Sequence, residues 1–331
     1  MTRLPKGGRV FRAFRESEKQ SRTGASDCCV EPVRLGLSRL QGRVPVFREI
    51  MLTIACVSAL TTNAAADPKG MPRSGPWVAN YDRDACHLAA KFGAGDDEIT
   101  LRFARYEPSD QFALTVYGKR LPVEGVWSEA EIDFGLAAKP IKAFSLNGGA
   151  GDKKATIFSG QRIDGWKPKL WNDPAPSITT EQEAKVTGVD IAFKVKRPTY
   201  RLRLEFGSLV RPLAQLRDCT TNLVKRWGYD PAVQATLSRK ATPTAPPQSW
   251  VTNKDFPEGA SRAGHIGTVQ FRFDIGADAR ILGCYVLDRT DPDSFGDLSC
   301  RLLSSRARFH PALDAAGKPV RSYFVHKIAW M

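Results

Sequence analysis

Short runs in which apolar and polar residues alternate recur along the chain from about residue 76 to its end. The clearest run, residues 267–275, carries Val269, Phe271, Phe273 and Ile275 with polar residues between them. A period of two residues is the pattern of a half-buried β-strand, so the chain is expected to fold mainly as antiparallel sheet. Similar runs occupy residues 99–106, 112–117, 131–134, 141–146, 156–159, 189–195 and 200–206.

One amphipathic helix follows these strands. Pro212 suits the first turn of this helix, and Gly228 suits its C-terminal cap. We therefore expect residues 76–237 to form a β-rich domain, antiparallel and sandwich-like, which a helix at residues 210–228 closes. The residues that recur at the spacing of one helical face are Leu213, Leu216, Cys219, Thr220, Leu223, Val224 and Trp227.

Residues 238–249 separate this domain from the rest of the chain. They have no apolar pattern and contain Pro243, Pro246 and Pro247. A segment of this composition is expected to be a Pro-rich linker, partly extended, that spaces two domains over a short distance.

A second domain is expected over residues 250–331. The strand at 267–275 is followed by a turn at Gly276 and a return strand at 280–287. A helix from 291 to about 306 and a last strand at 320–330 complete the segment. The order strand, strand, helix, strand predicts a small ββαβ module, and the fold class of the whole chain is α+β.

The N-terminal region carries much of the net charge of +14. Residues 1–49 are basic and patternless, and we expect a disordered extension, with translation starting nearer residues 45–51 as a hypothesis. Residues 50–66 hold a short apolar run and then Ala64-Ala65-Ala66. This pattern predicts a signal peptide cleaved after an Ala-x-Ala site formed by Ala64 and Ala66. The run is too short to span a bilayer, although retention as a membrane anchor is the second interpretation.

Removal of residues 1–66 would leave four cysteines: Cys86, Cys219, Cys284 and Cys300. An even number of cysteines in an exported chain indicates disulfides. Three pairings can be drawn, of which Cys86–Cys219 with Cys284–Cys300 is the economical one because the linker separates the two pairs. A metal site is not expected, since no CxxC or HxxxH spacing occurs and the histidines are scattered.

The C-terminal segment resembles a known family, the C-terminal domain of TonB-type energy transducers. An aromatic-Pro pair at Phe256-Pro257 and Ala260 open the resemblance, and Gly267-Thr268-Val269 matches the family's first strand. Further matches are Ala-Arg-Phe-His-Pro-Ala at 307–312 and Gly-Lys-Pro-Val at 317–320. The resemblance covers about residues 250–331.

This resemblance implies a periplasmic, protein-binding role in transmembrane transport. It implies that the terminal strand pairs with a short peptide of an outer-membrane receptor by β-augmentation. An ordinary half-buried strand is the alternative, and an exposed terminal strand also allows a homodimer through the same edge. The residues of the implied edge are Arg321, Ser322, Tyr323, Phe324, Val325, His326, Lys327 and Ile328.

Other functions have little support in the sequence. No nucleic-acid-binding motif occurs, and Arg102, Arg105, Arg201 and Arg203 alternate on strands as on a solvated face. No catalytic motif occurs, so neither an enzyme nor a cofactor is expected. We predict an exported periplasmic adaptor with a TonB-like domain. The alternatives are an energy transducer anchored through residues 50–66, which would also need a long spacer, and a periplasmic scaffold without a transport role.

Overall fold

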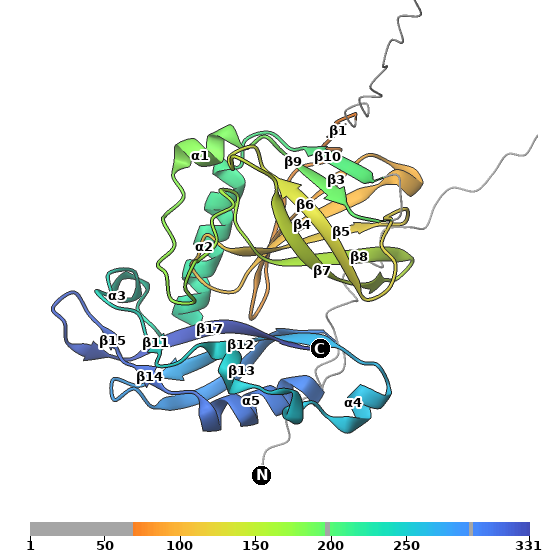
Figure 1. Cartoon of the computed structure of the whole chain (residues 1–331). Helices are drawn as coiled ribbons and strands as arrows, with labels where there is room; N and C mark the ends of the chain where they lie inside the picture. The colour runs from red at the N-terminus through yellow and green to blue at the C-terminus, as the bar shows by residue number, and fades with distance from the viewer. Residues whose placement is uncertain (1–68, 196–198, 291–293) are drawn as a thin grey trace, which may run out of the picture. The chain divides into compact units, whose positions relative to one another are not determined.

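The computed structural model describes residues 69–195, 199–290 and 294–331. The expected basic extension (1–49), the signal peptide (50–66) and its cleavage residues Ala64 and Ala66 lie outside the described residues. Residues 68–331 form one compact unit, in which an N-terminal sheet precedes a smaller C-terminal domain (Figure 1).

The N-terminal part is a single ten-stranded sheet in the order β1-β10-β9-β6-β7-β8-β5-β4-β3-β2. Every pairing is antiparallel except that of β1 with β10. Its strands are β1 (Met71–Pro72), β2 (Val78–Tyr81), β3 (Cys86–Phe92), β4 (Ile99–Arg105), β5 (Phe112–Gly118), β6 (Trp127–Asp133), β7 (Ile141–Ala150), β8 (Lys153–Gln161), β9 (Gly188–Phe193) and β10 (Tyr200–Glu205), with a short 3-10 helix η1 (Gly95–Asp97) between β3 and β4.

The sheet closes on itself. Arg73, directly after β1, forms a β-bridge with Phe92 of β3, and the Ser74 amide donates a hydrogen bond to the Lys91 carbonyl at 2.8 Å. The strands therefore enclose their own core as a barrel, where the sequence suggested two packed sheets. Alternation shows which side chains point inward, but it does not show whether ten twisted strands stack as two layers or close as one.

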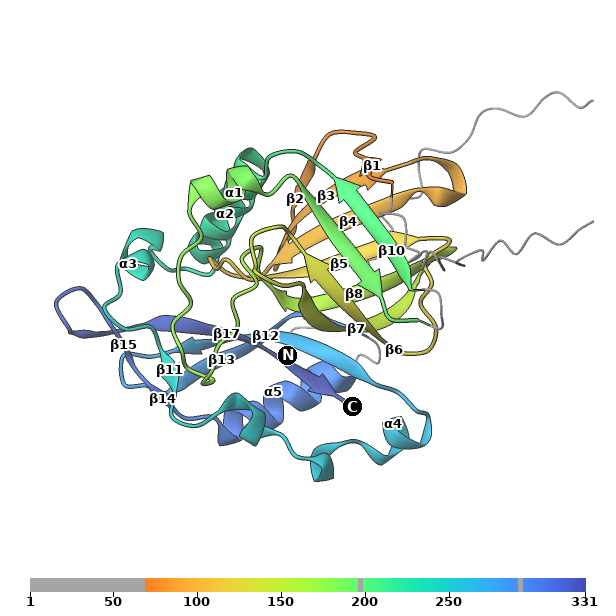
Figure 2. The same ribbon diagram turned by 45° about the horizontal axis from the view of Figure 1, so that its top comes forward.

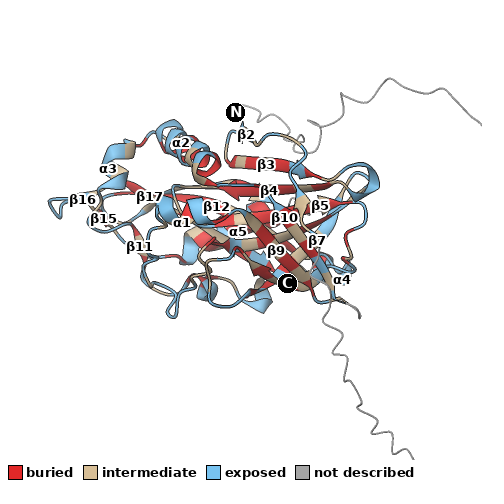
Figure 3. Cartoon of the chain, turned by 90° about the horizontal axis from the view of Figure 1, so that it is seen from above, coloured by how far each residue is buried: buried red, intermediate tan, exposed pale blue. Residues whose placement is uncertain are grey.

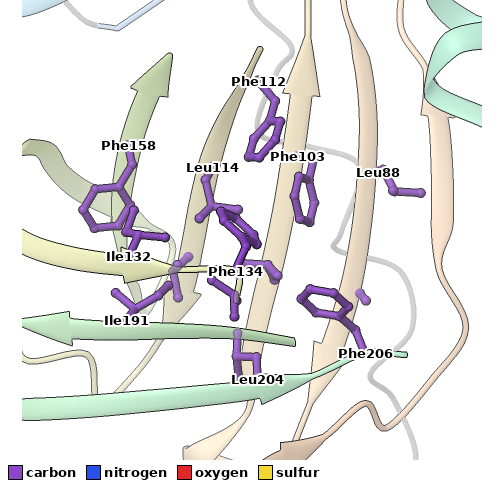
Figure 4. Close-up of a cluster of buried hydrophobic side chains, with 14 of the residues drawn as sticks. Leu88, Phe103, Phe112, Leu114, Ile132, Phe134, Phe158, Ile191, Leu204 and Phe206 are labelled. Carbon is purple, nitrogen blue, oxygen red and sulfur yellow. The ribbon is translucent and has the colours of Figure 1, made fainter. Parts of the chain in front are cut away.

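The inward side chains of these strands form one apolar core, seen in Figure 4. Phe103 of β4 packs edge-on against Phe112 of β5, with ring centroids 4.7 Å apart. Figure 3 shows the same alternation as burial, with β3 and β4 largely buried. Each strand thus contributes alternate residues to the core.

Helix α2 (Val210–Arg226) packs on this barrel where the periodicity predicts a helix. Leu213, Leu216, Leu223 and Val224 are buried, and Gly228 follows the helix with a φ of 82° that favours glycine. A short helix α1 (Thr180–Lys185), which the sequence analysis missed, begins at a capping box and precedes β9. Helix α3 (Pro231–Ala235) follows α2.

Two disulfides join the same cysteine pairs that the sequence favoured. The first bonds Cys86 of β3 to Cys219 of α2, and the second bonds Cys284 to Cys300 in the C-terminal domain. Each ties a strand to the helix that packs on it.

The C-terminal domain contains a three-stranded sheet in the order β13-β12-β17. Helix α5 lies along one face of this sheet (Figure 2), where Phe295 and Leu303 pack on Phe271 and Phe273. Its elements are η2 (Pro247–Trp250), η3 (Asn253–Asp255), α4 (Glu258–Arg262), β12 (Gly267–Ile275), β13 (Ile281–Arg289), α5 (Ser294–Arg306), β14 (Phe309–His310), β15 (Ala312–Leu313), β16 (Pro319–Val320) and β17 (Ser322–Trp330).

Residues 238–249, expected as a linker, pack on this C-terminal domain. Strand β11 (Thr242–Pro243) pairs with β14, and the Thr244 amide donates to the Arg308 carbonyl at 2.9 Å. Ala241 and Trp250 are buried in the core of the domain. The prolines therefore fit an edge segment that donates few backbone hydrogen bonds, and the segment is not a free spacer.

Candidate functional site

The terminal strand that the sequence singled out is β17. It pairs with β12 along its whole length, from Ser322 opposite Ile275 to Trp330 opposite Gly267. Among the described residues, no strand pairs with its other edge. Of the eight predicted edge residues, Arg321 directly precedes the strand and the other seven lie within it.

One side of β17 belongs to the domain core. Phe324 lies 5.1 Å from Phe309 and 6.0 Å from Trp250 between ring centroids, and His326 stacks on it at 5.5 Å. Burial lowers the pKa of His326 to about 4, so its imidazole is neutral at neutral pH. These side chains hold the strand in place.

The opposite face of the three-stranded sheet is covered by the N-terminal part of the chain. The Arg272 guanidinium of β12 lies between the rings of Trp227, after α2, and Tyr285 of β13, at 4.4 and 4.3 Å. Arg272 also forms a buried ion pair with Asp274 at 3.0 Å. Because the cationic guanidinium contacts two aromatic rings and a carboxylate, these contacts favour one orientation of the N-terminal part on the sheet.

Further polar contacts extend this covered face. The Tyr106 hydroxyl, after β4, donates a hydrogen bond to the Asp288 carboxylate of β13. Tyr323 of β17 packs between Trp227 and Tyr229, with ring centroids 5.2 and 5.3 Å away. Burial raises the pKa of the nearby Glu107 carboxyl to about 7. The sequence analysis named Trp227 on the helix and Tyr323 on the edge strand, but it missed that Trp227 and Tyr229 pack on Tyr323, because only the tertiary structure shows this contact.

The beginning of the free β17 edge is occupied by the same N-terminal part. The Tyr229 hydroxyl donates to the Ser322 carbonyl at 2.8 Å. The Gln234 side chain donates to the Arg321 carbonyl at 3.1 Å and accepts from the Ser322 hydroxyl at 2.6 Å. An added strand would therefore pair with β17 beyond Ser322.

The end of β17 borders a small cavity of about 90 Å³. Lys327, Ala329 and Trp330 line one side of it, and Trp127 and Phe144 of the barrel line the other. The outward position of Phe144 could have been found from the sequence. In residues 141–146, Ile141, Ala143 and Ser145 are buried, so an aromatic residue falls on the side reserved for polar ones.

The arginines interpreted as a solvated face have mixed positions. Arg201 is exposed, whereas Arg105 is buried and burial lowers its pKa to about 10. Arg102 lies over the Tyr117 ring at 5.4 Å. The expectation of a solvated face is therefore wrong for Arg105, which lies buried at the end of β4.

Cys86 and its neighbour His87 point to opposite sides of β3. Cys86 is fully buried in the barrel core and disulfide-bonded, while His87 faces outward and its pKa is lowered to about 4 by burial and by Arg102. Among the residues that the structure describes, no three His, Cys, Asp or Glu side chains gather in a manner suited to a metal ion. At β17 the structure thus presents an edge without a strand partner among the described residues.

Comparison with known families agrees with this geometry. Residues 252–331 match the family of the Gram-negative bacterial TonB protein C-terminal. The recognition made from the sequence motifs is confirmed for this segment, called the TonB-like domain below. The match covers roughly a quarter of the chain and leaves the barrel outside it.

No curated protein and no solved structure matches the chain. Within the described residues, no helix has both the length and the apolar character needed to cross a membrane.

Proposed function

We propose that this chain is an exported periplasmic adaptor whose TonB-like domain binds an extended segment of an outer-membrane transport protein along β17. The observation that carries the proposal is the edge of β17 beyond Ser322, which has no strand partner among the described residues. Unpaired N–H and C=O groups on such an edge can pair with an added strand. The match to the TonB protein C-terminal supports the class of partner and the Gram-negative envelope.

The two disulfides support the compartment. Disulfides persist in oxidising compartments such as the periplasm and are rare in the cytosol. Both bonds lie in the described part of the chain, and Cys86 and Cys219 are buried. Cleavage after Ala66 would release this part as a soluble protein.

Packing of residues 238–249 favours an adaptor over an anchored energy transducer. These residues pair with β14 and contribute Ala241 to the TonB-like domain. A transducer anchored through residues 50–66 would need a free spacer to reach the outer membrane, and this segment does not provide one. The end of helix α2 instead contacts the sheet face directly, through Trp227 against Arg272.

The test is site-specific photo-crosslinking in Gram-negative cells that produce the full chain. A photoreactive residue replaces exposed Ala329 at the end of β17, and the matched control replaces Leu282, which is exposed on β13. We expect position 329, and not position 282, to capture an outer-membrane transport protein through an extended segment.

Four results would contradict this proposal or select an alternative. Capture of a second copy alone from position 329 would indicate a homodimer through β17. Equal capture from both positions, or none from 329, would contradict strand addition at this edge. Recovery of the chain in the inner membrane, with residues 50–66 retained, would favour the anchored transducer.

A further inference from the structure

The covered face of the TonB-like sheet ends in a gap beside Lys327 and Ala329. Their partners on β12 are Gln270 and Thr268, which alternate with the buried Val269 and Phe271. Because alternate residues point to opposite faces, Lys327 and Ala329 lie on the face that the barrel covers elsewhere. The cavity of about 90 Å³ lies here, and both domains line it.

The barrel side of this gap is apolar and exposed. Phe144 of β7 is 72% exposed and Trp127 of β6 is 45% exposed. The neighbouring strands β6 and β7 place Trp127 opposite Leu146 and Phe144 opposite Glu129, so both rings lie near one end of the pair. Large apolar side chains that remain exposed next to a cavity are typical of an interaction surface. The cavity is smaller than the ~150 Å³ site that accepts benzene, so it fits an aliphatic side chain.

Lys327 places a positive charge at the lining of this gap. Within the described part of the chain, its ammonium has no hydrogen bond or ion pair, and burial lowers its pKa to about 8. A cation in this position is stabilised by a carboxylate brought by a partner. Ala329, two residues along the same face, is small and leaves space between β17 and the barrel.

We infer that the barrel completes the peptide site, which selects a strand with an acidic residue opposite Lys327 and an aliphatic residue opposite Ala329. The two selected residues stand two positions apart, since side chains alternate along a strand. The aliphatic residue enters the cavity between Ala329 and Phe144. This inference rests on the proposed function and adds the chemistry of the partner segment, together with a role for the barrel.

The test is selection from a phage-displayed library of random peptides as long as β17, with the full chain as bait. We expect enriched peptides to carry Asp or Glu two positions from Leu, Ile or Val. Phe144→Ser should weaken binding of an enriched peptide about tenfold, the effect of losing an apolar contact worth about one methylene or two. Lys327→Met should remove the acidic preference, and Lys327→Glu should select a basic residue in its place.

Matched controls use exposed residues away from the gap. Leu282→Ser on β13 and Lys318→Met in the β15–β16 turn should leave the peptide affinity unchanged. N-methylation of alternate backbone amides of the enriched peptide should weaken binding at least tenfold in one of the two alternate registers, the one whose N–H groups face β17, and should have little effect in the other.

The outcomes separate the two proposals. If no peptide is enriched, or if N-methylation leaves the affinity unchanged in both alternate registers, strand addition is wrong and this inference falls with it. If enriched peptides depend on their amides but bind Phe144→Ser and Lys327→Met as tightly as the native chain, strand addition stands and only the present inference, the role of the barrel and of Lys327, is overturned.

Discussion

The two main sheets of this chain differ in what happens at their edges. The N-terminal sheet uses β1 to bridge β10 and β3, so its strands close around a core. The TonB-like sheet has only β13, β12 and β17 and stays open, although a disulfide ties each sheet to a helix in the same way. Closure satisfies backbone groups internally, whereas an open sheet keeps an edge on which a partner can add. We therefore expect the barrel to contribute most of the stability and β17 to bind the partner.

The largest difference in stability between the two sheets should appear when their disulfides are removed. Cys86–Cys219 spans 133 residues and Cys284–Cys300 spans 16. In the chain-entropy account, removing the first with Cys86→Ser and Cys219→Ser should cost about 5 kcal/mol, and removing the second about 3 kcal/mol. Equilibrium unfolding in urea measures both. A larger loss from the short loop would contradict this ranking.

Substitutions of Phe103 and Phe144 allow the buried core of the barrel to be compared with its exposed surface. Phe103→Ala should cost about 4 kcal/mol, because it empties a fully buried position in the barrel core. Phe144→Ala should cost less than about 0.5 kcal/mol, because the ring is mostly exposed. Thermal and urea unfolding of the two variants test the contrast, and similar losses would show that Phe144 is part of the packed core.

Arg272 tests the contact between the two sheets. Arg272→Leu leaves the buried Asp274 with Arg321 as its remaining ion-pair partner, at 3.1 Å, and should cost about 3 kcal/mol. The control is Arg280→Leu, which removes an exposed ion pair with Asp278 and should cost less than about 0.5 kcal/mol. Equal stability of the two variants in urea would mean that the polar contact does not hold the domains together.

Substitution of Lys327 should have a small effect on stability, and of opposite sign to the losses above. Its folded-state pKa of about 8 lies below the ordinary value of 10.5, so the folded chain binds the proton less well than the unfolded chain. Its contribution to stability is present above pH 10.5 and is lost as the pH falls toward 8.

Lys327→Met should therefore raise the free energy of unfolding at pH 7 by about 1 kcal/mol and flatten its dependence between pH 8 and 10. Urea unfolding at several pH values measures this, with Lys318→Met as the exposed control. A destabilised Lys327→Met variant would show that the charge already has a stabilising partner.

Much of the local structure could be predicted from residue patterns. Alternation located the strand over 267–275, and helical periodicity located α2 with Cys219 on its inner face. Local patterns failed where both faces of a strand are buried. The polar side of β12 carries Arg272 and Asp274, which alternation alone would leave in solvent, yet both are buried and Trp227 after α2 packs on Arg272. Residues 238–249 similarly lack an apolar period yet pair with β14.

Residue patterns alone predicted the strands, the main helix and the TonB-like motifs, because each depends on the spacing of residues near one another in the chain. The cysteine pairs, which include one 133 residues apart, were favoured from the position of the expected linker. Contacts in three dimensions were needed to show that the barrel closes, that the N-terminal part of the chain covers one face of the TonB-like sheet, and that Phe144 and Lys327 line one cavity. Those facts depend on contacts between separate elements, such as β1 with β10 and β7 with β17, and no short-range period encodes them.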